Sequence, residues 1–222
     1  MVANRVYDFS HQVGGREMLG DVALALGEGE NVYCIVRSAI ASLVLRLTIG
    51  EIPGDENIVG EFGRRGDGDG EFVWPAGIAV DCKYNVYVTD EWLNRITVFD
   101  QEGAYIRHWG ESGSSVGQLN RPSGIEIDSD GDLYVADSLN HRVQKFSVHG
   151  ETLGYWGSFG ADVGEFNSPW GLTLDDAGNV YVADHKNHRV QKFTSTGEYI
   201  MQFGSYGAGN GQMNRPADVA VD

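Results

Sequence analysis

The side chains best suited to do chemistry in this chain stand in short segments rich in turn-forming residues. His141, His185 and His188 carry imidazoles that could bind zinc or transfer a proton. Arg121 and Arg215 carry guanidinium groups that could hold a carboxylate or a phosphate. The question is which structural elements would bring these five side chains to one surface.

Glu126 and two tryptophans complete the candidate set. Glu126 stands within the apolar run 124–128 and is the best candidate for a catalytic acid or base; a wall residue held in a salt bridge is the alternative. Trp74 and Trp170 offer flat apolar faces to a ligand. The alternative is that the tryptophans pack between structural units and that the two arginines are solvated.

A repeat of 47 residues positions these candidates. Its opening motif is a proline, two residues, two apolar residues separated by one position, and a closing aspartate, and it recurs without gaps at 75–81, 122–128, 169–175 and 216–222. Each full copy has four runs of strand length separated by turns. The second run, such as 133–136, is apolar at nearly every position, which fits a strand covered on both faces. Four-stranded sheets covered by copies of themselves are propeller blades.

Three sequence motifs resemble a known family. They are Gly-Ile-Ala-Val-Asp at 77–81, Asn-Val-Tyr-Val at 85–88 and Asn-His-Arg-Val-Gln-Lys-Phe at 140–146. Together they resemble the NHL repeat, well over 58–222 and weakly over 20–57. The resemblance implies a radial ring, usually of six blades, in which each blade has an inner strand, two middle strands and an outer strand.

We therefore expect an all-β chain that forms one NHL-type β-propeller domain over residues 1–222. The expected blades are about 20–63, 75–110, 122–157 and 169–204, followed by one extra inner strand at 216–222 and with an outer closing strand at 5–13. This predicts an incomplete ring from a six-bladed parent. A closed four-bladed ring is the alternative, but it gives 216–222 no purpose. Open blade faces predict self-association.

Strand order places two sets of loops at one end of every blade. The segment before an inner strand and the turn between the middle strands both lie there, so the candidate side chains should surround the mouth of the central channel. Trp74, Arg121, Ser168 and Arg215 occupy one equivalent position with different chemistry, which suits a ligand surface. His141 and His188 are equivalent positions one blade apart and too distant to share one ion, so we predict no metal site.

Repeated carboxylates predict structure and not catalysis. Asp137 precedes Arg142 by five residues, and the same spacing recurs in the neighbouring copies. A carboxylate there can accept turn amides and pair with the arginine of the returning strand in every blade. The segment 128–132 has alternate aspartates like the start of a calcium loop, but it lacks the glutamate at the twelfth position and is better explained as a turn.

Composition and charge restrict the kind of partner and the cellular location that we expect. The net charge of −16 disfavours non-specific binding to nucleic acid. We see no signal peptide and no membrane-spanning run, and the two cysteines at non-equivalent positions favour a reducing compartment, so a cytoplasmic location is expected.

These patterns favour a scaffold that binds a protein or a small-molecule ligand through the channel mouth, with no cofactor. The alternative is a propeller enzyme, a lyase or hydrolase that could depend on a metal, with its site in the channel. Zinc-dependent peptidyl-hydroxyglycine lyases of the same fold have histidine directly after the inner-strand proline. Here those positions hold Ala76, Ser123, Trp170 and Ala217, so that chemistry is not supported.

Overall fold

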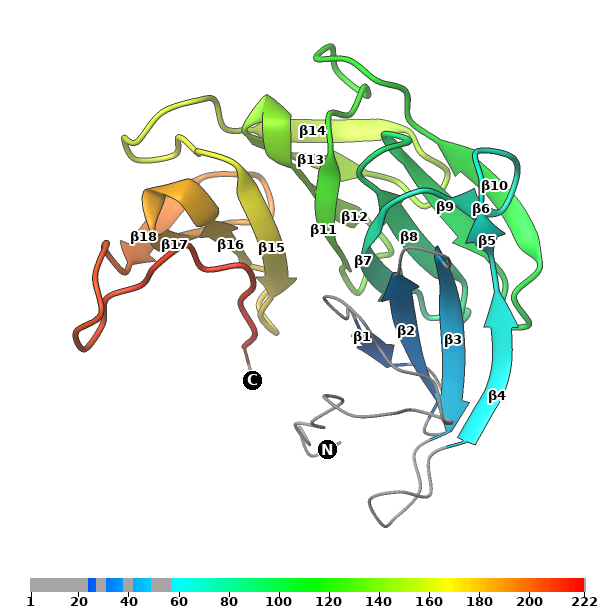
Figure 1. Cartoon of the computed structure of the whole chain (residues 1–222). Coiled ribbons are helices and arrows are strands. Elements are labelled where there is room, and N and C mark those ends of the chain that lie inside the picture. The colour runs from blue at the N-terminus through cyan, green and yellow to red at the C-terminus, as the bar shows by residue number, and fades with distance from the viewer. Residues whose placement is uncertain (1–23, 27–30, 38–41, 49–56, 222) are drawn as a thin grey trace.

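The described part of the chain forms four antiparallel sheets of four strands each, together with one short pair of strands. A computed structural model describes residues 24–26, 31–37, 42–48 and 57–221. In every sheet the strands are hydrogen-bonded in chain order. This confirms the all-β propeller fold and the four four-stranded blades predicted from the repeat (Figure 1).

The blades follow the chain from the N-terminus. The first has β1 (Leu24–Leu26), β2 (Asn31–Arg37), β3 (Ser42–Thr48) and β4 (Asn57–Phe62). The second has β7 (Pro75–Val80), β8 (Val86–Asp90), β9 (Arg95–Phe99) and β10 (Tyr105–Trp109). The third has β11 (Pro122–Ile127), β12 (Leu133–Asp137), β13 (Arg142–Phe146) and β14 (Thr152–Trp156). The fourth has β15 (Pro169–Leu174), β16 (Val180–Asp184), β17 (Arg189–Phe193) and β18 (Tyr199–Phe203).

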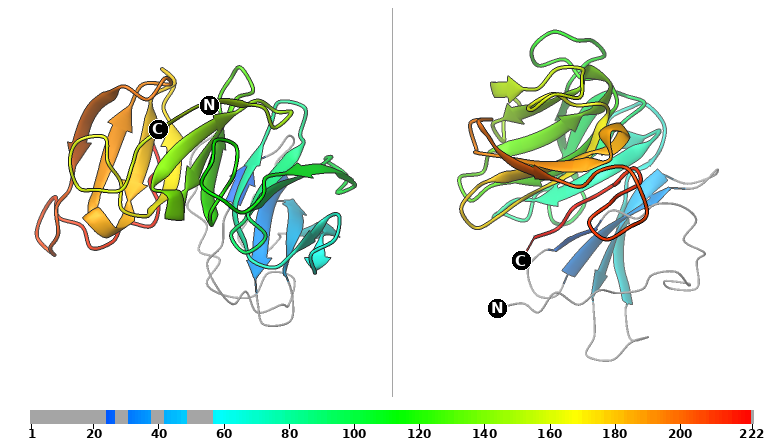
Figure 2. Two further views of the ribbon diagram at one scale, coloured as in Figure 1. Left: turned by 90° about the horizontal axis from the view of Figure 1, so that it is seen from above. Right: turned by 90° about the vertical axis from the view of Figure 1, so that its left-hand side faces the viewer.

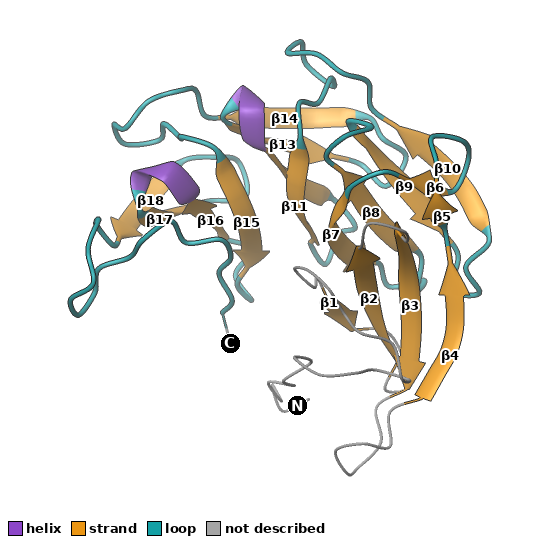
Figure 3. Cartoon of the chain, in the orientation of Figure 1, coloured by secondary structure: helices purple, strands orange, loops and turns teal. Residues whose placement is uncertain are grey.

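Shorter elements that the sequence did not predict join these strands. β5 (Arg64–Arg65) and β6 (Glu71–Phe72) form a small parallel pair in the loop between the first two blades. Two 3₁₀ turns, η1 (Ser138–Asn140) and η2 (His185–Asn187), follow the second strand of the third and fourth blades (Figure 3). No helix of the described part of the chain is long and apolar enough to cross a membrane.

The blades are arranged face to face around a common centre. The inner strands β7 and β15 both contact β11, and β1 contacts β7. Figure 2 shows the sheets following one another in chain order, and in Figure 1 the first and fourth lie at the two ends of an open arc. Whether a longer protein carries six blades stays a prediction.

Most of the described apolar core lies between the blades, and a fourth, smaller cluster of Cys34, Leu45 and Leu47 lies on the first blade alone. One cluster joins the first blade to the second, with Tyr33 and Phe62 against Phe99. Two equivalent clusters join the second blade to the third and the third to the fourth. All five residues of β8 and of β12 are buried, as expected for strands covered on both faces.

One expected strand is not formed. Residues 216–221 carry no strand, although they follow the inner-strand motif. Figure 1 shows the segment running beside β15, and the amide of Gly171 donates to the carbonyl of Ala217. The other inner strands form a ladder with a second strand of their own blade, and this segment has no such partner among the described residues. The expected closing strand at 5–13 lies outside the described residues.

A glycine of one blade packs against an aromatic ring of the preceding blade at each interface between adjacent blades. Gly150, in the turn after β13, has a φ of +88° and lies over Trp109 of the preceding blade. A Cβ at Gly150 would lie 2.7 Å from the indole Cγ, which is too close. Gly103 lies on Phe62 and Gly197 on Trp156 in the same way. The repeated glycine is therefore a requirement of blade packing.

The G150A variant should lower the free energy of unfolding by about 2–4 kcal/mol, because backbone strain adds to overpacking against Trp109. Urea unfolding followed by circular dichroism measures the loss. The control is G178A, since Gly178 has a φ of +77° with nothing within 4 Å of its Cβ, and it should lose only about 1 kcal/mol. Equal losses in the two variants would show that the contact with Trp109 contributes nothing.

Candidate functional site

The two predicted sets of loops meet at one end of the blades, which we call the mouth face. It consists of the segments before the inner strands (73–74, 120–121, 167–168 and 214–215) and the turns after the second strands (91–94, 138–141 and 185–188). One backbone hydrogen bond joins the two sets within each blade: Glu91 to Trp74, Leu139 to Asn120 and Lys186 to Asn167. Strand order therefore predicted correctly which loops share an end.

A fully buried carboxylate fixes this arrangement in the third blade. Asp137 accepts hydrogen bonds from the amide of Asn120 at 2.7 Å and from the side chains of Asn140, Arg142 and Gln144 at 2.8, 2.8 and 3.0 Å. Burial raises the pKa of Asp137, while the hydrogen bonds from Asn120, Asn140 and Arg142 and the charge of Arg142 oppose the rise. The carboxylate thus ties the loop before β11 to the turn after β12.

The arginine continues the network into the loop that connects two blades. The guanidinium of Arg142 donates to the carbonyls of Ser114, Ser115 and Gln118. Asp184 and Arg189 repeat the ion pair in the fourth blade, at the same Nε to Oδ2 distance of 2.8 Å. The prediction that these carboxylates accept turn amides and pair with arginine is confirmed in both blades.

The second blade departs from that prediction. Asp90 accepts the amides of Val73, Trp74, Trp92 and Leu93 instead. The Nε of Arg95 is buried with no hydrogen-bond partner among the described residues, so the expected ion pair is not formed. The oxygens of Asp90 are already occupied by four backbone amides. In the third blade Gln144 supplies a side-chain donor to the equivalent aspartate, but the second blade has Thr97 at that position.

Two of the predicted histidines join neighbouring blades. The Nδ1 of His141 accepts a hydrogen bond from the amide of Ser168 at 3.1 Å, and His188 does the same for Arg215 at 3.0 Å. In the second blade the Oδ1 of Asn94 does the same for Arg121 at 2.8 Å. Each ring must therefore hold Nδ1 unprotonated, which leaves only Nε2 for a ligand. Ligand binding by these two histidines stays a prediction.

The residues whose amides are held this way share an unusual backbone. Arg121, Ser168 and Arg215 have φ values of 52°, 54° and 54°, in the left-handed region that non-glycine residues seldom adopt. The acceptor on the preceding blade stabilises this conformation. The side chains of Arg121 and Arg215 are exposed and make no hydrogen bond or ion pair with any described residue.

His185 has a different environment. Its Nδ1 lies 3.2 Å from the carbonyl of Pro216, so this nitrogen carries the proton. Its ring contacts the indole of Trp170, with 4.7 Å between the centroids. Burial lowers the pKa of His185, and the positive charges of Arg215 and Lys186 lower it further. Trp170, His185, Lys186 and Arg215 therefore lie together at the mouth of the fourth blade.

Trp74 lies at the mouth of the second blade. The guanidinium of Arg37 lies over its indole, 4.4 Å from the ring centroid, and the tryptophan is 47% exposed. The predicted mouth tryptophans are thus half-exposed and each contacts a nitrogen-bearing side chain. Trp74 therefore packs in part against the first blade and stays about half exposed, and Arg121 and Arg215 are solvated as the alternative holds.

Glu126 is half-buried on β11. Burial raises the pKa of Glu126 to about 6, the amide of Ile127 opposes the rise, and the charge of Asp218 adds to it. Asp218 comes from the segment after the fourth blade, and its own pKa is raised by burial. No described base or nucleophile is hydrogen-bonded to Glu126. The expected salt bridge to Glu126 is also not formed among the described residues.

The aspartates at the start of the predicted calcium-like loop serve the turn. Asp128 accepts the amides of Asp130 and Asp132 and the hydroxyl of Tyr134. Lys145 pairs with Asp132 at 2.8 Å. Within the described part of the chain, no three side chains of ligand type gather closely enough to suggest a metal site.

Exposed apolar side chains at the mouth face were missed by the sequence reasoning. Trp92 is 64% exposed, and Leu139 is its equivalent on the next blade. Phe159 and Tyr206 are 67% and 69% exposed and lie against His141 and His188, with 4.8 Å between the ring centroids in both pairs. Their signal was available, since these positions hold different residues in successive repeats.

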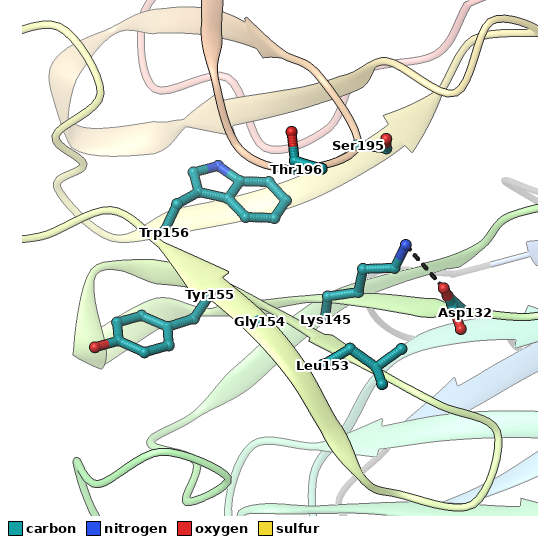
Figure 4. Close-up of a pocket in the computed structure, with 8 residues that line it drawn as sticks. All are labelled: Asp132, Lys145, Leu153, Gly154, Tyr155, Trp156, Ser195 and Thr196. Carbon is teal, nitrogen blue, oxygen red and sulfur yellow. Dashed lines mark ion pairs between the residues drawn. The ribbon is translucent and has the colours of Figure 1, made fainter.

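A separate cavity lies at the outer rim, away from the mouth face. It has a volume of about 260 Å³ between β14 and the turn after β17 (Figure 4). An ion pair between Lys145 and Asp132 closes one side. None of the predicted site residues lines it; the lining residues are Asp132, Lys145, Leu153, Gly154, Tyr155, Trp156, Ser195 and Thr196.

The fold and the repeated turn define a β-propeller, and comparisons with known proteins specify its type. The NHL repeat family matches residues 119–146 and 166–193. Over 45 residues the chain is 47% identical to Protein lin-41 of Caenorhabditis elegans, which is 20% of this chain and 4% of that protein. Two stretches of the chain therefore match NHL repeats, and its fold is that of a β-propeller.

Solved structures share the fold. A Bacteroides thetaiotaomicron protein of unknown function matches with a TM-score of 0.66 and 21% identity, over 88% of this chain and 52% of that one. Virginiamycin B lyase of Staphylococcus aureus, in a catalytically inactive form with quinupristin, matches with a TM-score of 0.58 and 14% identity, over 82% and 54%. The chain thus spans about half the length of these two proteins.

Removing the buried carboxylate should unfold the mouth. The D137A variant leaves the charge of Arg142 buried without its partner, so the free energy of unfolding should fall by about 3–5 kcal/mol. Chemical denaturation measures the loss. The control is D130A, which removes the same charge from an exposed side chain. A D137A protein within about 0.5 kcal/mol of the wild type would contradict a structural role for the network.

Acid should weaken the contact between the third and fourth blades. The pKa of His141 is lowered by burial and by Lys186, against the opposing charges of Asp137 and Asp184. A lowered pKa means that the unfolded chain binds the proton more readily. This stability is therefore complete above about pH 6.5 and is lost as the pH falls towards the folded-state pKa.

Asparagine provides the matched variant, because Asn94 already does this work in the second blade. H141N should keep the hydrogen bond to Ser168. Its melting temperature should therefore fall less between pH 7 and pH 5 than that of the wild type. H149N, which changes an exposed histidine in a turn, should leave the pH profile unchanged. Identical profiles for H141N and the wild type would show that His141 does not titrate against this bond.

Proposed function

We propose that this protein is a binding scaffold that holds a protein partner, or a smaller ligand, on the mouth face of its propeller. The observation that carries the proposal is that repeated and unrepeated side chains of that face have different roles. Repeated side chains such as Asp137 and Arg142 bind one another and hold the blade together. Unrepeated side chains such as Trp92 and Phe159 stay exposed beside them.

The character of the exposed residues supports a protein partner. Aromatic residues and arginine are enriched where proteins meet, and exposed aromatic side chains gathered on one face mark an interaction site. Trp74, Trp92, Phe159 and Tyr206 are all at least 47% exposed. A rigid frame beneath them reduces the entropy lost when a partner binds.

A random peptide display library tests this proposal. Peptides enriched on the wild-type chain should bind L139A and F159A at least tenfold more weakly, because each variant removes apolar contact area at the mouth. L153A is the matched control, since Leu153 is a similarly exposed leucine at the rim cavity. Peptides that lose affinity for L153A, and keep it for both mouth variants, would move the binding surface away from the mouth.

An enzyme is the second candidate. It is favoured by Glu126, whose pKa is raised to about 6 on an inner strand, and by the lyase among the proteins of similar fold. A lyase or hydrolase would use Glu126 as its acid or base. Turnover of quinupristin by the wild-type chain and its loss in E126Q, followed by liquid chromatography, would support the enzyme; we expect no turnover.

Three further properties remain proposals. A cytoplasmic location is supported by Cys34 and Cys82, both of which are free thiols. Residues 1–222 are proposed to form a single domain. Self-association is supported by β18, where all five residues are exposed although the equivalent strands β10 and β14 alternate.

A further inference from the structure

One part of the mouth face is positively charged although the protein is strongly acidic. The net charge of the chain is −16, and most described cations are engaged in ion pairs or in hydrogen bonds to carbonyl groups. Lys186 and Arg215 are exceptions. Both side chains are exposed, and neither makes a hydrogen bond or ion pair with any described residue.

These two cations come from positions next to an aromatic pair. Lys186 follows His185 in the chain, and Arg215 precedes Pro216, whose carbonyl lies 3.2 Å from the Nδ1 of His185. The ring of His185 contacts Trp170, which is 39% exposed. Lys186 also acts on His141, one blade back. We call Trp170, His185, Lys186 and Arg215 the cationic patch.

The patch is held in place from below. The carbonyl of Pro216 fixes the His185 ring through Nδ1, and the carbonyl of Trp170 accepts a hydrogen bond from the buried hydroxyl of Ser123 at 2.8 Å. The amide of Arg215 is held by His188. The backbone of the patch is therefore fixed before any ligand arrives, while its two cationic ends are free to pair.

We infer that the cationic patch binds an acidic peptide segment of the partner. A carboxylate of the segment would pair with Lys186 and Arg215, and an adjacent apolar side chain would lie on Trp170. This inference rests on the proposed function and specifies the chemistry of the partner. Charge complementarity carries it, because Lys186 and Arg215 are two exposed cations beside one exposed aromatic ring on a protein whose net charge is −16.

A nucleic acid fits the patch less well. A polyanion bound through its backbone needs a track of several cations, and its affinity would be opposed by the overall charge of −16. Two cations around one aromatic pair match a single carboxylate with an apolar neighbour. An acidic peptide offers this carboxylate and apolar side chain. It also brings few negative charges close to the acidic remainder of the protein.

The test uses a short fluorescein-labelled peptide rich in Asp and Glu with one Phe, titrated against the 222-residue chain. K186E and R215E should each weaken binding about tenfold through charge reversal at the contact. K83E is the matched control, because Lys83 is exposed in the turn at the opposite end of the second blade, and the change in net charge is the same. It should bind as the wild type does.

The His185 ring gives an independent readout by NMR. A bound carboxylate offsets the positive field of Lys186 and Arg215, so the pKa of His185 should rise when the acidic peptide is added and should not move with an uncharged Gln and Asn analogue. Inorganic phosphate and single-stranded RNA of equal charge are the competing anions. Tighter binding of either one than of the peptide would overturn the inference.

The outcomes separate the two proposals. Equal weakening by K83E and K186E would mean that only the net charge matters and would overturn the inference. Library peptides that bind at the mouth but are neutral or basic would also overturn it and leave the scaffold function standing. If the mouth binds neither library peptides nor the acidic peptide, both proposals fail.

Discussion

The buried carboxylate at the end of each middle strand is the interaction on which the rest of the mouth depends. Asp137 has no exposed surface, so every oxygen lone pair must be satisfied within the protein. It does so by collecting an amide from the loop before β11, a side chain from the turn after β12 and two from β13. Arg142 then orders the loop that connects two blades. The buried carboxylate and its arginine thereby fix two loops, 110–121 and 138–141, that would otherwise cost much entropy to order.

Blade packing adds a second constraint that acts perpendicular to the strands. Aromatic rings at the ends of outer strands fit under glycines of the following blade, as Trp109 does under Gly150. Three of the four apolar clusters of the described residues lie at interfaces between blades, so each blade depends on its neighbours for stability. The two constraints together account for the repeated Asp and Arg residues of the mouth and for the repeated glycines and aromatic residues between blades. The residues that differ from blade to blade are therefore free to serve recognition.

The fold could be predicted from the sequence because the residues that form each blade recur in every repeat. The period of 47 placed the strands, and the Asp to Arg spacing predicted the ion pairs of the third and fourth blades. The site was harder to predict. That His141 and His188 accept amides from the next blade depends on the left-handed backbone of Ser168 and Arg215, which no residue pattern marks. The missing ion pair of Arg95 likewise depends on how many amides reach Asp90.

The central claim is that repeated residues build the blades and unrepeated mouth residues bind. Saturation mutagenesis of the chain, scored separately for folded abundance and for binding of a peptide directed to the mouth, tests it most directly. Substitutions at Asp137, Arg142 and Gly150 should reduce both scores together. Substitutions at Trp92, Phe159 and Lys186 should reduce binding and leave abundance unchanged. A binding score that follows abundance at every mouth position would contradict the claim.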